Sequence, residues 1–89
     1  MNTYVLTFAS THAAMASSKT LASGGIDFWT IPTPREISAG CGIALRFDAE
    51  DPEEVVSRIF GSAANRKVSG WATLYIQVAD KQYEKVSDL

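Results

Sequence analysis

Cys41 is the only cysteine of this 89-residue chain, and it lies between two glycines, Gly40 and Gly42. Glycine has no side chain to shield the backbone around the sulfur, and Pro32 and Pro34 disfavour a helix before it. The pattern therefore predicts an exposed loop that presents a thiol at the start of a strand. A deprotonated thiol in such a loop can attack a sulfur electrophile or hold a bound chalcogen atom.

Four stretches alternate apolar and polar residues and predict strands, at residues 3–8, 26–31, 42–47 and 70–78. In the third of them, Ile43, Leu45 and Phe47 are expected to face inward. An alanine-rich stretch predicts a helix that is capped by Ser10 or Thr11 and ends at Gly24.

A second helix is predicted after Asp51, where Pro52 suits the first helical position and two glutamates follow. Its apolar side chains form a stripe that needs a sheet to lie on, namely Val55, Val56, Ile59, Phe60 and Ala63. The order β-α-β-β-α-β predicts an α+β, ferredoxin-like sandwich with both helices on one face of a four-stranded antiparallel sheet in the order 4-1-3-2. We expect one domain over residues 1–80 and a polar tail, loose or briefly helical, over residues 81–89.

This topology makes a geometric prediction about Cys41. The third strand lies beside the first and runs opposite to it, so its beginning meets the start of the first helix at Ser10, Thr11 and His12. A helix N-terminus favours an anion, His12 adds a proton donor or acceptor, and Arg35 adds a positive charge. A thiolate at Cys41 is the expected state.

Each of these residues also has a purely structural interpretation. Free cysteine is among the most buried residue types, and the flanking glycines could serve only a tight turn. His12 could be an ordinary first-turn residue, and Arg35 could simply pair with Glu36.

Composition narrows the classes of partner. The formal net charge is -2 and the pI is about 5.2, which argues against nucleic acid as a partner. One cysteine and one histidine do not make a zinc site, and no cofactor is expected. No signal peptide or membrane-spanning stretch is visible, so we expect a cytoplasmic protein without membrane contact.

The sheet face without helices is expected to carry apolar and aromatic side chains, namely Val5, Trp29, Trp71 and Tyr75. An apolar face of this kind commonly marks an interface. A homodimer through this face is the predicted assembly.

Two segments of the chain resemble a known family. They are Y-V-L-T-F-A-S-T-H-A-A at Tyr4 to Ala14 and I-P-T-P-R-E-I-S-A-G-C-G-I-A-L-R at Ile31 to Arg46. Together with Gly25 and Ile26, they resemble the small bacterial domain described as putative selenium/sulfur carrier protein-like. The family's motif residues fall on Ser10, Thr11, His12, Pro32, Thr33, Pro34, Arg35, Cys41 and Gly42.

The resemblance implies a carrier rather than an enzyme with its own turnover. Cys41 would hold sulfur or selenium as a persulfide-type adduct, between a donor enzyme and an acceptor protein. The predicted site then combines Cys41, His12 and Arg35 as reacting groups with a surround of binding residues, namely Ser10, Thr11, Thr33, Gly40 and Gly42. The alternative is a non-catalytic, ligand-binding or dimerising regulatory module in which Cys41 is structural.

Overall fold

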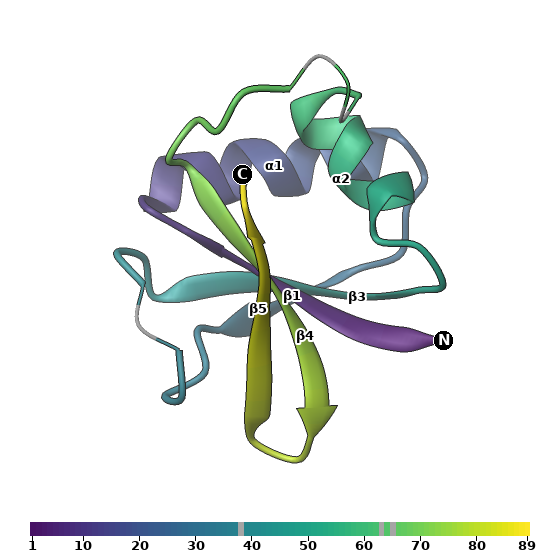
Figure 1. Cartoon of the computed structure of the whole chain (residues 1–89). Helices are drawn as coiled ribbons and strands as arrows, with labels where there is room; N and C mark the ends of the chain where they lie inside the picture. Colours follow the sequence, from purple (N-terminus) through teal and green to yellow (C-terminus); the bar gives the residue numbers. More distant parts are fainter. Residues whose placement is uncertain (38, 63, 65) are drawn as a thin grey trace.

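The computed structural model describes residues 1–37, 39–62, 64 and 66–89. Two helices lie on one side of a twisted, five-stranded antiparallel sheet (Figure 1). The elements in chain order are β1 (Asn2–Phe8), α1 (Thr11–Ser23), β2 (Trp29–Pro32), β3 (Ile43–Ala49), α2 (Glu53–Phe60), β4 (Ala72–Ala79) and β5 (Gln82–Asp88). The α+β class is as predicted, but the predicted number of four strands is wrong.

The fifth strand arises from the segment that we expected to be a loose or briefly helical tail. β4 and β5 are joined by a tight turn at Asp80 and Lys81, and Lys81 has a φ of 58°. β5 is an edge strand that pairs with β4 alone, so its stability comes from main-chain hydrogen bonds and needs no apolar alternation. The polar sequence of β5 therefore gave no alternating pattern from which this strand could be predicted. The division of the chain at residue 80 stays a prediction.

β1 is the middle strand, between β3 and β4, in the sheet order β2-β3-β1-β4-β5. The predicted antiparallel pairing of the first and third strands is confirmed, with Leu6 opposite Leu45 and also opposite Leu74 of β4. These three leucines pack in the main core beneath the helices.

The helices contribute small and branched side chains to this core. Ser10 is the N-cap of α1, and its hydroxyl accepts a hydrogen bond from the Ala13 N–H at 3.2 Å. In α2 the predicted stripe holds in part, because Val55 and Val56 are buried and Ile59 and Phe60 are half-buried, while Ala63 lies outside the described residues. No helix within the described part of the chain is long and apolar enough to cross a membrane.

The sheet face opposite the helices is not open as predicted. Val5 is fully buried there, in a second, smaller cluster with Ala44 and with Ile37 from the β2–β3 loop. The loop thus folds back over the face that we expected to be bare. Trp29 remains half exposed, under the Arg46 guanidinium at 4.9 Å from the ring centroid. Trp71 does not belong to this face, because it lines a cavity with Ile59 and Phe60 of α2.

A substitution at Leu89 measures how much β5 and its end contribute to stability. Leu89 is buried in the main core, and its N–H donates to the Ala72 carbonyl at 2.9 Å. We expect Leu89→Ala to lower the free energy of unfolding by roughly 2–4 kcal/mol in urea titrations. The control is Val86→Ala, at a half-exposed position of β5, which ends one residue before Leu89. It should change the free energy of unfolding by less than about 0.5 kcal/mol. Equal effects of the two variants would show that the end of the chain does not stabilise the core.

Candidate functional site

The candidate site is built where the β2–β3 loop meets the junction of β1 and α1. Thr33 closes the loop at its base with two hydrogen bonds. Its N–H donates to the Gly42 carbonyl at 2.9 Å, and its hydroxyl donates to the Cys41 carbonyl at 2.8 Å. Thr33 therefore fixes the main chain on both sides of the Cys41–Gly42 peptide bond.

Gly40 holds the loop against the β1–α1 junction by close backbone contact. A Cβ atom at this position would lie 2.5 Å from the Ala9 carbonyl oxygen, closer than packed atoms can approach. Ala9 is itself fixed, since its N–H donates to the Trp71 carbonyl at 2.8 Å. The absence of a side chain at Gly40 thus allows this close backbone contact.

Cys41 is buried, with 4% of its surface exposed, so the predicted exposed thiol is wrong. The side chain belongs to the main core. The side chain is buried because of strand periodicity. Cys41 precedes Ile43, Leu45 and Phe47 at steps of two residues, so it points in the same inward direction. The sequence carried this signal, which the flanking glycines obscured.

The sulfur has two polar neighbours. The Ile43 N–H donates to Sγ at 3.3 Å, and the Thr11 hydroxyl lies 3.5 Å from Sγ, with either of these two atoms able to act as donor. Thr11 is the first residue of α1, so the sulfur lies at a helix N-terminus. Hydrogen bonds become stronger when the acceptor is ionised, so both groups can stabilise negative charge on sulfur.

The other predicted residues make no hydrogen bond to the sulfur among the described contacts. Ser10 caps α1, and Gly42 is exposed next to the cysteine. His12 and Arg35 are also exposed, and none of the hydrogen bonds and ion pairs among the described residues joins either of them to Cys41. Their roles in chemistry stay predictions.

Two contributors were missed by the sequence analysis. The first is the Ile43 N–H, which donates to the sulfur. Because it is a main-chain group, the type of residue at position 43 gives no sign of this contact. Ile37 is 6% exposed on the far face of the sheet. An isolated isoleucine in a loop gives no periodic signal.

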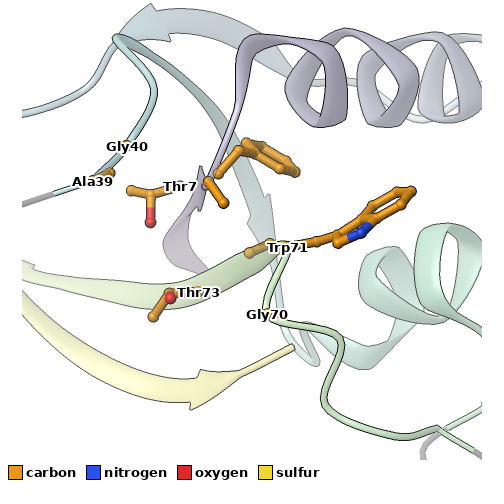
Figure 2. Close-up of a pocket in the computed structure, with 9 residues that line it drawn as sticks. Thr7, Ala39, Gly40, Gly70, Trp71 and Thr73 are labelled. Carbon is orange, nitrogen blue, oxygen red and sulfur yellow. The ribbon is translucent and has the colours of Figure 1, made fainter.

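A small cavity lies beside this loop, with Ala39 and Gly40 on one side and Gly70, Trp71 and Thr73 on the other (Figure 2). Its volume is about 110 Å³, and Cys41 is not among the described residues that line it. No group of three or more His, Cys, Asp or Glu side chains in the described segments could hold a metal ion.

Loss of the Thr33 hydroxyl should weaken the base of the loop. Thr33→Val keeps the shape of the side chain but leaves the Cys41 carbonyl without its 2.8 Å partner. We expect the free energy of unfolding to fall by about 1–2 kcal/mol. The control is Thr30→Val, at an exposed position of β2, the strand that ends one residue before Thr33. It should change the free energy of unfolding by less than about 0.5 kcal/mol. Indistinguishable urea midpoints for the two variants would contradict this account of Thr33.

Comparison with known protein families assigns the chain to one of them. A family model described as putative Se/S carrier protein-like matches residues 3–68. The chain belongs to this family. The match runs from β1 past the end of α2, so the Se/S carrier-like segment includes Thr11, Thr33, Gly40, Cys41 and Ile43. No curated protein and no solved structure matches the chain.

Proposed function

We propose that this member of the Se/S carrier-like family carries sulfur or selenium on Cys41, as a persulfide or its selenium analogue. The observation that supports this most directly is the pair of polar groups at the sulfur, the Ile43 N–H at 3.3 Å and the Thr11 hydroxyl at 3.5 Å. Both groups can donate a hydrogen bond to the sulfur during its reaction. Membership of the family supports sulfur or selenium as the cargo.

The proposed loading step exchanges one S–S bond for another. The Cys41 thiolate, whose proton has passed to solvent, attacks the outer sulfur of a persulfide on a donor enzyme. A new S–S bond forms on Cys41, the bond in the donor breaks, and the donor cysteine leaves as a thiolate, so no external oxidant is needed. An acceptor nucleophile then takes the outer sulfur, and the Cys41 thiolate leaves. A reducing cytoplasm, the proposed compartment, keeps a lone thiol free between these cycles.

His12 and Arg35 have a proposed place in the exposed form of the site. Both side chains face solvent on segments that flank the buried cysteine. They can act on the sulfur once it is brought outward, His12 as a proton acceptor and Arg35 as a positive charge beside the anion.

The test is the intact mass of the protein after incubation with a cysteine desulfurase and cysteine in buffer without reductant. We expect the wild type to gain the mass of at least one sulfur atom and to lose it again on addition of dithiothreitol. A wild-type mass that never changes, with a desulfurase shown to be active by its alanine product, contradicts the proposed function.

Burial of Cys41 supports a second candidate, a non-catalytic module in which the cysteine only packs in the core. In this case the half-exposed Trp29, stacked under Arg46, is the natural contact for a homodimer. Sedimentation of the wild type and Trp29→Ala discriminates the two: a dimer lost in the variant, together with no sulfur adduct on the wild type, favours the module.

A further inference from the structure

Cys41 is 4% exposed, which excludes direct attack by its sulfur on a group of another protein. Attack requires the two sulfur atoms to meet in line. The cysteine must therefore leave the core before it can exchange an atom with a partner. The contacts that keep it inside decide how readily this happens.

The β2–β3 loop is fastened at three described places. Two of these places adjoin the cysteine. They are the Thr33 hydrogen bonds and the close backbone contact of Gly40 with Ala9. The third is Ile37, which is buried at 6% exposure while Arg35, Glu36 and Ala39 around it are exposed. Ile37 is thus the loop's apolar anchor.

Ile37 and Cys41 are held on opposite faces of the sheet. The cysteine packs in the main core under the helices, whereas Ile37 packs with Val5 and Ala44 on the other face. Among the described residues, the cluster around Ile37 has three buried members, with Ile31, Tyr75 and Tyr83 half-buried beside them. Small satellite clusters open at a lower free energy than the main core, because fewer apolar contacts are lost.

We infer that Ile37 is a releasable anchor that controls access to Cys41. When Ile37 leaves Val5 and Ala44, the loop loses its apolar contact with the sheet. The two Thr33 hydrogen bonds at its base must then also break before the cysteine moves outward, while β1, α1 and β4 stay folded. This deepens the proposed function and rests on it, since it states how a buried carrier thiol reaches its partners. Access to the thiol itself is measured without any cargo or donor.

The test is the rate of Cys41 alkylation by iodoacetamide in the native protein, measured with Ile37→Ala, Ile37→Val and Val55→Ala. Val55 is equally buried but lies on α2, away from the loop. We expect Ile37→Ala to raise the rate roughly 30-fold or more, and Ile37→Val by roughly twofold to tenfold. Val55→Ala should destabilise the whole fold but raise the rate of Cys41 alkylation much less than Ile37→Ala does. The rate should change little over low urea concentrations, because local opening exposes little surface.

Two results would overturn the inference. One is an Ile37→Ala rate equal to that of the wild type. The other is a rate that follows the global free energy of unfolding across urea and across all variants, Val55→Ala included. Failure of the carrier function is a separate outcome: a protein with Ile37-controlled alkylation that takes no sulfur from a desulfurase refutes the cargo and leaves the anchor intact.

Discussion

Cys41→Ser is expected to take up no sulfur from a desulfurase, the largest functional effect of any substitution in the chain. Its fold should survive, because a serine hydroxyl can still accept from the Ile43 N–H that donates to Sγ at 3.3 Å. Cys41→Ala is expected to lose loading as well and to be less stable than Cys41→Ser. In this variant the Ile43 N–H and the Thr11 hydroxyl both lose their partner, at a cost of about 1–3 kcal/mol.

The pair of variants separates chemistry from packing. Intact mass after loading measures sulfur uptake by each variant, and the urea midpoint measures the stability of its fold. A sulfur adduct that persists on a folded Cys41→Ser protein would contradict the assignment of the thiol, since no other cysteine is present in the chain.

Gly40→Ala is expected to have the largest effect on the position of the loop. The new Cβ would meet the Ala9 carbonyl oxygen at 2.5 Å, and this oxygen belongs to a backbone that is itself fixed by a hydrogen bond to Trp71. The loop must shift away from the β1–α1 junction. We expect the free energy of unfolding to fall by roughly 1–3 kcal/mol and Cys41 to become more accessible to alkylation.

Gly42 on the other side of the cysteine is the matched control. A Cβ atom there would have no neighbour within 4 Å, and Gly42 is not among the positive-φ glycines. Gly42→Ala should therefore leave alkylation unchanged and stabilise the protein by up to about 1 kcal/mol, because alanine restricts the unfolded chain. If both variants behave alike in urea and in alkylation, the Gly40 contact does not hold the loop.

Much of the fold could be predicted because each element leaves a local signal. Alternation predicted β1 and β3. The cap of α1 was expected at Ser10 or Thr11, and the structure has Ser10 as the N-cap. The pairing of the two strands then placed Thr11 beside Cys41, two residues far apart in the sequence. β5 could not be found in this way, because an edge strand that pairs through its main chain can be polar throughout.

The sequence predicted that Cys41 lies beside the start of α1, but not that the cysteine is buried. The glycines beside Cys41 suggested an open loop, whereas Gly40 serves a close backbone contact and the cysteine continues the inward alternation of β3. Ile37 shows the limit of local patterns, because only the tertiary fold tells which loop residue will cover the sheet. A buried Cys41 can act as a carrier only if the β2–β3 loop opens, and Ile37 is proposed to control this opening.

The most direct test of the account is to load the wild-type protein with a desulfurase and isotopically labelled cysteine, then to digest it and map the label. We predict labelled sulfur on the peptide that contains Cys41, released by dithiothreitol. A Cys41 peptide without label, from a protein whose thiol is intact by alkylation in urea and whose donor enzyme is active, would contradict the claim that Cys41 carries the chalcogen.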